Sequence, residues 1–360
     1  MSLSPTSAVD QYDMLTTVSD FKADLVKGLG SDPKSIPSKY LFDKKGSELF
    51  DLETRQPEYY LAESEHEIYR YFGPEVARAL GENVLIIEPG SGACIKVGLL
   101  MESFEKPAGY VAIDLSKEFM VKSVEKFAEK HPSLPLSCIA ADYFHLDPMP
   151  ATVAALGEKR LVFFPGSTIG FYDREEAIRL LASLRDLAGP GGKILVGADL
   201  QKSPDLIKKA YGDQAQVADR FHLNLLQRAN REAGSNFDLL KFRYEAVYNE
   251  DEHRVETYVV SMASQSVTVD DQKFEIANGE RIRTGYAYKY TAEQFQELAE
   301  DAGCRPVGLW LDSRQYFSVH LLEGSLGVTD VSPEVTDASP GVTDVSPGVT
   351  DVSPEVTDVS

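Results

Sequence analysis

The sequence predicts an α/β protein with a doubly covered parallel sheet and a second, smaller α+β part. Between residues 84 and 203, short apolar runs alternate with amphipathic segments, which is the pattern of repeated strand–helix units. From 241 to 290 the chain instead shows strand-like alternation without intervening helices, as expected of an antiparallel sheet. A glycine-rich turn directly follows the first apolar run, a feature of nucleotide-binding sheets.

The expected elements follow these periodicities in chain order. Helices are expected at 20–29, 46–55, 63–80, 95–104, 117–130, 174–187, 204–233 and 292–302. Strands are expected at 84–87, 110–113, 136–140, 161–164, 194–196, 241–248, 256–261, 266–269, 281–290, 306–311 and 316–321.

The domain organisation follows from where the pattern changes. We expect 62–203 and 287–323 to form the cofactor-binding domain, and 16–61 with 204–286 to form the smaller substrate-recognition domain. Residues 1–15 are expected to be flexible. Residues 324–360 contain a seven-residue acidic repeat, V-T-D-V-S-P-E and its variants, with a proline in each full copy. These prolines exclude a coiled coil, so this tail is expected to be disordered.

Composition restricts the function classes. The 360-residue chain has a formal net charge of −21, of which the tail supplies seven acidic residues, and this balance argues against nucleic-acid binding. The three cysteines are far apart, which indicates a reducing compartment. No apolar run is long enough to cross a membrane. We therefore expect a cytoplasmic protein, a monomer, that acts on a small molecule.

The turn V-L-I-I-E-P-G-S-G-A-C-I-K, residues 84–96, is the strongest local signal. Gly90 and Gly92 permit close approach of the backbone to a ligand, and the amides that open the next helix favour an anionic group. A dinucleotide fingerprint requires a third glycine where Ile95 stands, so an oxidoreductase is the weaker of two nucleotide-binding interpretations.

Acidic residues follow the next two expected strands. Asp114 ends V-A-I-D, and Asp142 precedes Tyr143 in A-A-D-Y. The Asp114 carboxylate could accept hydrogen bonds from both hydroxyls of a ribose. Asp142 could accept a hydrogen bond from the amino group of adenine, and Tyr143 could cover the adenine ring. A lone acid at a strand end is often only a helix cap; two in succession after a glycine turn favour a nucleoside site.

Longer motifs give the chain a specific resemblance between residues 37 and 322. They are Y-L-F-D-K-K-G-S-E-L-F, P-E-Y-Y, E-P-G-S-G, F-F-P-G-S-T-I-G-F, A-Y-G-D, N-L-L-Q-R-A-N-R-E and G-E-R-I-R-T-G-Y-A-Y-K-Y. With these the chain resembles the histidine-specific Nα-methyltransferases of ergothioneine biosynthesis, a family that includes fungal tryptophan-derivative N-methyltransferases. The resemblance implies a class I, Rossmann-like methyltransferase sheet and S-adenosyl-L-methionine as cofactor.

The resemblance also implies roles for individual residues. Tyr59 and Thr168 would lie at the methyl-transfer site. The cofactor-binding residues would be Glu88, Gly90, Gly92, Lys96, Asp114, Asp142, Tyr143 and Gly166, with Lys96 meeting the methionine carboxylate. The substrate would be contacted by Phe42, Phe50, Tyr59, Phe171, Tyr211, Gly285 and Ala287. No metal site is expected, because none of the six histidines has suitable spacing.

Several of these positions depart from the family pattern. Phe171 stands where the family has an asparagine that binds the substrate's amino-acid backbone, and Phe42 replaces a tyrosine. Gly285 and Ala287 replace the glutamate and serine that hold the imidazole. Loss of those two groups removes roughly 2–4 kcal/mol of hydrogen bonding, which is about two to three orders of magnitude in affinity. An alternative is that Phe171 points into the core and another donor replaces the asparagine.

These observations predict an N-methyltransferase for the amine of a small aromatic amino acid or a derived amine. Histidine Nα-methylation is the second possibility, and a non-catalytic cofactor-binding scaffold is the alternative from another class. No dedicated base is evident. His222 is a candidate, although a lone histidine in an apolar helix is more commonly structural.

Overall fold

The main sheet runs through the larger part of the computed structural model, which describes residues 9–14, 21–143, 149–157 and 159–324. Within these residues its strand order is β1-β4-β3-β2-β5-β6-β13-β12. Neighbours from β1 to β6 are parallel, whereas β13 is antiparallel to both β6 and β12. The strands are β1 (Asp10–Asp13), β2 (Val84–Pro89), β3 (Gly109–Asp114), β4 (Leu136–Ala140), β5 (Lys159–Phe164), β6 (Lys193–Asp199), β12 (Cys304–Leu311) and β13 (Phe317–Gly324).

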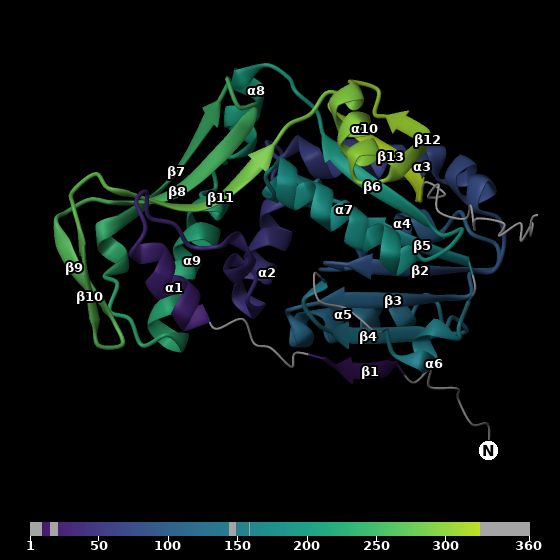
Figure 1. The fold of residues 1–360 in the computed structure, drawn as a ribbon, viewed down its shortest axis with the longest axis horizontal. Helices are drawn as coiled ribbons and strands as arrows, with labels where there is room; N and C mark the ends of the chain where they lie inside the picture. The colour runs from purple at the N-terminus through teal and green to yellow at the C-terminus, as the bar shows by residue number, and fades with distance from the viewer. Residues whose placement is uncertain (1–8, 15–20, 144–148, 158, 325–360) are drawn as a thin grey trace, which may run out of the picture. The chain divides into compact units, whose positions relative to one another are not determined.

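Helices cover both faces of this sheet, as Figure 1 shows. On β2, Val84 and Ile86 pack in one core while Leu85 and Ile87 pack in another, because successive side chains of a strand point to opposite faces. The first face carries α3 (Tyr60–Leu80), α4 (Ile95–Met101) and α5 (Lys117–Ala128). The opposite face carries α6 (Ala151–Ala154), α7 (Arg174–Ala188) and α10 (Ala292–Asp301). The predicted α/β class, with its parallel sheet buried on both sides, is confirmed.

A second core lies between helices and antiparallel strands. The three-stranded sheet has the order β11-β8-β7, and β9 pairs with β10 in a separate hairpin. These strands are β7 (Phe242–Asn249), β8 (Arg254–Ser261), β9 (Gln265–Val269), β10 (Gln272–Ile276) and β11 (Arg281–Tyr288). The helices are α1 (Phe21–Leu29), α2 (Lys44–Glu53) and α9 (Val217–Glu232), with the short 3-10 turns η1 (Ser38–Leu41) and η4 (Leu239–Lys241). Helix α8 (Pro204–Ala210) and the 3-10 turn η3 (Thr168–Phe171) instead pack in the cores of the main sheet.

The buried members of this second core come from residues 21–49 and 221–282. Figure 1 shows β7, β8 and β11 near α9, away from β2, β3 and β4. The described residues nevertheless group as one unit by their contacts. The two-domain boundaries expected from the sequence therefore stay a prediction.

Three local features differ from the sequence-based expectation. The stretch 204–233 is two helices rather than one, because Gln216 has a positive φ of 54° and Asp213 accepts hydrogen bonds from the Val217 and Ala218 amides, which starts α9 afresh. Residues 1–15 are expected to be flexible, yet Asp10–Asp13 forms β1 beside β4. Strand β10 is not predicted. The expected disordered tail begins at residue 324, but Gly324 is the last residue of β13; the rest of this prediction, 325–360, lies outside the described residues.

No helix in the described part of the chain is both long and apolar enough to span a membrane.

Candidate active site

The glycine-rich turn joins β2 to α4 at the carboxyl end of the sheet. Gly90 and Gly92 have φ values of 72° and 51°, in the left-handed region that glycine adopts without a Cβ penalty. The amides of Gly90 and Ser91 both donate to the Ile113 carbonyl, at 2.8 and 3.2 Å. The turn is thereby fixed against the end of β3, as the sequence predicts.

Asp114 ends β3 directly beside this turn. Its carboxylate accepts hydrogen bonds from the amides of Gly92, at 3.1 Å, and Ser116, at 2.8 Å. Burial raises the pKa of Asp114, while these backbone donors act in the opposite direction. The two amides hold the carboxylate in a fixed orientation at the cavity wall, where it can accept further hydroxyl donors.

One cavity collects most of the residues that the sequence analysis singles out. Those that line it are Phe42, Phe50, Glu88, Gly90, Gly92, Lys96, Asp114, Tyr143, Gly166, Thr168 and Phe171. Asp142 instead lines an adjoining groove, which shares Phe42 and Leu115 with the cavity. Ser38, His66, Phe119 and Tyr172 also line the cavity without having been predicted. The two glycines of the turn, the fixed carboxylate of Asp114 and several aromatic rings suit the binding of a nucleoside.

Glu88 is a buried carboxyl group at the end of β2. The Tyr110 hydroxyl donates to its Oε2 at 2.5 Å. Burial raises the pKa of Glu88 to about 8, although Tyr110 and Lys96 oppose that shift. At neutral pH the group is therefore largely protonated and able to donate a hydrogen bond.

Lys96 does not stand free at this site. Its Nζ lies 2.8 Å from Oε2 of Glu65, a carboxylate on α3 with no exposed side-chain surface. Glu65 also accepts hydrogen bonds from the Gly166 amide, at 2.9 and 3.0 Å, and from the Tyr69 hydroxyl, at 2.8 Å. If Lys96 binds a cofactor carboxylate, as the sequence analysis expects, it must do so while it is paired with Glu65.

Glu65 is a site residue that the sequence analysis missed. A signal existed, because Glu65 lies at helical spacing from Leu61 and Tyr69, on the apolar stripe of α3. A charged residue at such a position is rarely buried without a partner.

Gly166 lies in the loop after β5, and Thr168 begins the 3-10 turn η3. Gly166 has a φ of 81°, and an added Cβ would come within 2.7 Å of Lys96 Nζ. The Thr168 hydroxyl donates to the Pro165 carbonyl at 2.9 Å. Both residues therefore line the cavity next to the Glu65–Lys96 pair.

Aromatic rings form another wall of the cavity. The ring centroid of Phe42 lies 5.4 Å from that of Phe50 and 6.1 Å from that of Phe171. Phe221 packs behind them, 5.5 Å from both Phe42 and Phe50. Phe171 is half-buried and lines the cavity, so the alternative in which it points into the core is not what the structure shows.

Four predicted residues do not line the cavity, namely Tyr59, Tyr211, Gly285 and Ala287. The Tyr59 ring lies 6.3 Å from Phe50 and 6.4 Å from Tyr211. Gly285 lies beside Ser38, whose Cβ would be 3.5 Å from an added Cβ, and Ala287 is buried in the core of the main sheet. Direct contact of these four with a substrate stays a prediction.

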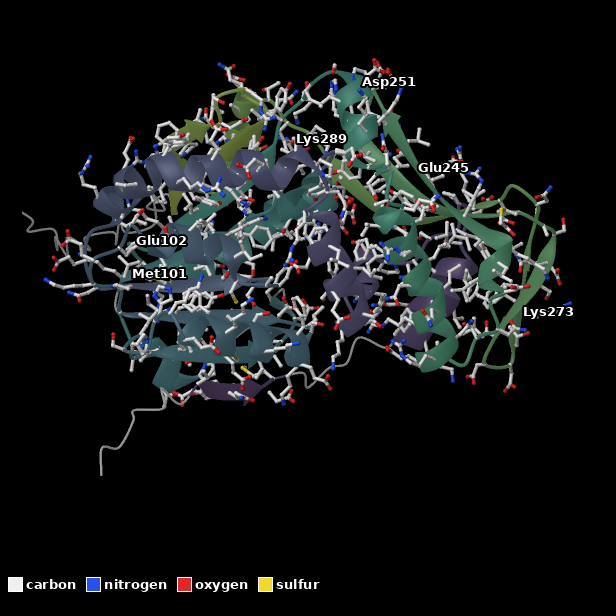
Figure 2. The ribbon with its side chains drawn as sticks, turned by 180° about the vertical axis from the view of Figure 1, so that it is seen from behind. Met101, Glu102, Glu245, Asp251, Lys273 and Lys289 are labelled. Atoms are coloured by element: carbon white, nitrogen blue, oxygen red, sulfur yellow. The ribbon has the colours of Figure 1, made fainter. Side chains whose placement is uncertain are left out.

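Tyr211 is held by a buried cluster of charged side chains, Asp199, Lys202 and Lys289. Lys289 Nζ donates to the Tyr211 hydroxyl and pairs with Asp199, both at 2.7 Å; Lys289 is labelled in Figure 2. Asp199 also accepts from Lys202 and from the Tyr60 hydroxyl. These lysines hold the pKa of Asp199 below its usual value despite its burial, so the carboxylate stays charged and Tyr211 is held in place.

His222 is buried and neutral. Its Nδ1 lies 2.8 Å from the Thr284 hydroxyl, and desolvation lowers its pKa to about 3. It does not line the cavity, which matches the structural interpretation of this histidine. Among the described residues, no group of three or more His, Cys, Asp or Glu side chains is placed to hold a metal ion.

Comparison with known proteins identifies relatives over almost the whole described chain. The sequence model for "Histidine-specific methyltransferase, SAM-dependent" matches residues 21–324. The histidine N-alpha-methyltransferase of Mycolicibacterium smegmatis is 32% identical over 306 residues, which cover 83% of this chain and 94% of the relative. The 4-dimethylallyltryptophan N-methyltransferase of Claviceps purpurea is 24% identical, with 79% and 90% covered. Among solved structures, the magnesium protoporphyrin IX methyltransferase of Synechocystis covers 80% of this chain and 98% of its own, at 10% identity and a TM-score of 0.44.

Proposed function

Since the chain belongs to the family of histidine-specific, S-adenosylmethionine-dependent methyltransferases, we propose that it methylates the amine nitrogen of a small aromatic amino acid or of an amine derived from one. That it is a SAM-dependent N-methyltransferase follows from the family; the substrate is the proposal. The observation that carries it is the aromatic wall of Phe42, Phe50 and Phe171 on the cavity beside the glycine turn.

The cofactor is assigned to this cavity because its polar groups match a nucleoside. Asp114 is held by two amides with its carboxylate at the cavity wall, and it would accept the ribose hydroxyls. Gly90 and Gly92 would admit the cofactor close to the backbone. Asp142 and Tyr143 would bind the adenine, and their neighbouring positions on the groove and the cavity support this division. Glu88, Lys96 and Gly166 would complete the site.

Bound cofactor supplies an electrophilic methyl group on a sulfonium, and this chain's residues must present a neutral amine to it. Thr168 lies at the cavity wall, and Tyr59 lies behind Phe50. In our proposal they orient the amine nitrogen, and its proton leaves to water. Alignment of the reacting atoms lowers the barrier by several kcal/mol without a dedicated base. The aromatic rings would stabilise a methylated ammonium through cation–π attraction.

Histidine is the second candidate substrate, favoured by the 32% identity with a histidine N-alpha-methyltransferase. Against it stands Gly285, which offers no side chain beside Ser38 and Thr257. Ala287 adds no hydrogen-bonding group. We therefore rank histidine below aromatic amino acids and amines.

A methylation screen with mass detection tests the proposal. Purified protein is incubated with S-adenosylmethionine and a panel of aromatic amino acids, their decarboxylated amines and histidine. We expect N-methylated aromatic products, with histidine turned over more slowly. Binding of S-adenosylhomocysteine, measured by calorimetry against NADH as control, reports the cofactor site separately. Cofactor binding without any methylated product would favour the scaffold alternative.

Tyr59→Phe tests the orienting role of the Tyr59 hydroxyl. We expect turnover to fall by at least about tenfold, the value of one hydrogen bond made in the transition state. Unchanged turnover would remove Tyr59 from that role.

The cellular setting is part of the same proposal. Cys94, Cys138 and Cys304 are all buried and free, which fits a reducing, cytoplasmic location. We also expect a monomer that binds no nucleic acid, given the net charge of −21. Cell fractionation and size-exclusion chromatography with light scattering check these two points.

A further inference from the structure

Helix α2, which carries Phe50 of the aromatic wall, also carries a buried carboxyl oxygen with no hydrogen-bond partner among the described residues. Glu53 is the last residue of α2 and is 4% exposed. Its Oε2 has no partner among the described residues. Burial and, to a smaller extent, the charge of Asp213 raise the pKa of Glu53 to about 8. Asp213 differs, because the start of α9 satisfies its oxygens. A buried carboxyl group without a partner costs folding free energy and calls for an explanation.

The hydroxyl of Tyr244 is a second buried polar group with no partner in the described chain. Tyr244 lies on β7, and its ring stacks on His222 at 4.5 Å. The pKa of Tyr244 is raised by burial first, then by Glu53 and Tyr211. The His222 ring also packs against Phe221 at 5.2 Å, and Phe221 packs against Phe50 at 5.5 Å. These ring contacts connect Tyr244 to the aromatic wall.

The same group is connected to the methyl-transfer end through Tyr59. Glu53 follows Phe50 by three residues on α2, so the two side chains share a helix face. The Phe50 ring lines the cavity and packs against Tyr59. The pKa of Tyr59 is raised mainly by burial, and also by Glu53 and by Glu65. Tyr59 therefore packs beside the face of α2 that carries both Phe50 and Glu53.

We propose that Glu53, with the Tyr244 hydroxyl, is a specificity site that accepts a hydrogen bond from an N–H group on the substrate's aromatic side chain. This inference rests on the proposed function and names the substrate feature that the aromatic wall alone does not select. A ring N–H supplies the donor that Glu53 lacks. Glu53 would then supply a polar contact to the substrate side chain that Gly285, without a side chain, does not offer. In this proposal the carboxyl group that contacts the substrate ring is on α2, at Glu53, and not on β11, where Gly285 stands.

The substitution Glu53→Met tests this role, because methionine has a similar volume and no hydrogen-bonding oxygen. The matched control is Glu48→Met, at an exposed glutamate on the same helix. The probes are tryptophan and tryptamine, each compared with its 1-methylindole analogue, which lacks the ring N–H. For each protein, kcat/KM is measured by mass with S-adenosylmethionine.

We expect the wild type and Glu48→Met to prefer the N–H form by about 10- to 100-fold, the range for a hydrogen bond to a charged or strongly polarised group. Glu53→Met should lose this preference. It should also melt at a higher temperature than the wild type without ligand, because it removes an unpartnered buried carboxyl group.

Two results would contradict this inference but leave the proposed function unaffected. One is an undiminished N–H preference in Glu53→Met. The other is a lower melting temperature for Glu53→Met, which would mean that Glu53 stabilises the fold. A wild type that binds S-adenosylhomocysteine but methylates no aromatic probe would instead overturn the proposed substrate class, and this inference with it.

Discussion

Replacing Glu65 by glutamine removes a buried negative charge that three donors share. The carboxylate accepts hydrogen bonds from the Gly166 amide and the Tyr69 hydroxyl and pairs with Lys96 at 2.8 Å. A glutamine keeps the shape but offers one acceptor oxygen, so its amide group must face at least one donor. Glu65→Gln is therefore expected to destabilise the fold.

The magnitude follows from the burial of the two partners. Loss of one hydrogen bond to a charged group costs about 1.5–3 kcal/mol. Breaking a fully buried ion pair costs about 3–5 kcal/mol, but the Lys96 side chain is 21% exposed and can be partly rehydrated. We expect the free energy of unfolding to fall by about 2–3 kcal/mol.

Urea unfolding followed by circular dichroism, without cofactor, measures this loss. The matched control is Glu63→Gln on the same helix, where Glu63 pairs with Arg70 at 2.9 Å and both side chains are largely exposed. An exposed pair contributes less than about 1 kcal/mol. If Glu65→Gln costs no more than Glu63→Gln, the cluster does not stabilise the loop at Gly166 and the reasoning is wrong.

Three further predictions follow from the site. Asp114→Ala is expected to weaken S-adenosylhomocysteine binding by roughly 100-fold in calorimetry, because two charge-assisted hydrogen bonds to hydroxyls are lost; an unchanged Kd would place the ribose elsewhere. Gly285→Glu, whose Cβ would lie 3.3 Å from the Thr257 hydroxyl, is expected to raise kcat/KM for histidine by at least about tenfold, measured by mass against the wild type; no gain would reject this position as the imidazole site. The folded-state pKa of Glu53 is raised to about 8, so its contribution to stability is present below its unfolded pKa of about 4.5 and is lost as the pH rises toward 8. Wild-type stability should therefore fall more steeply between pH 5 and 8 than that of Glu53→Met in parallel urea titrations, whereas equal slopes would contradict the shifted pKa.

The sequence by itself determined the parallel sheet and the residues at its carboxyl end. Apolar strands, glycine-rich turns and acidic residues at strand ends are local sequence patterns. Parallel strands bring their carboxyl ends to the same edge of the sheet. Gly90, Gly92 and Asp114 are therefore brought together by features that the sequence alone specifies, and all three line the cavity. The family resemblance implied that Gly166 and Thr168 also belong to this site, and both line the cavity.

Tertiary structure alone decided which side chains pair and which stay unpaired. The binding of Lys96 to Glu65 joins α4 to α3, and no spacing in the sequence specifies which carboxylate a lysine will meet. The place of Tyr59 and Tyr211 behind Phe50 likewise depends on how three separate helices pack. The sequence also does not reveal that Glu53 Oε2 is buried without a partner among the described residues, because desolvation depends on every element that surrounds a group. Local patterns are encoded along the chain, whereas burial and pairing arise only when distant segments meet.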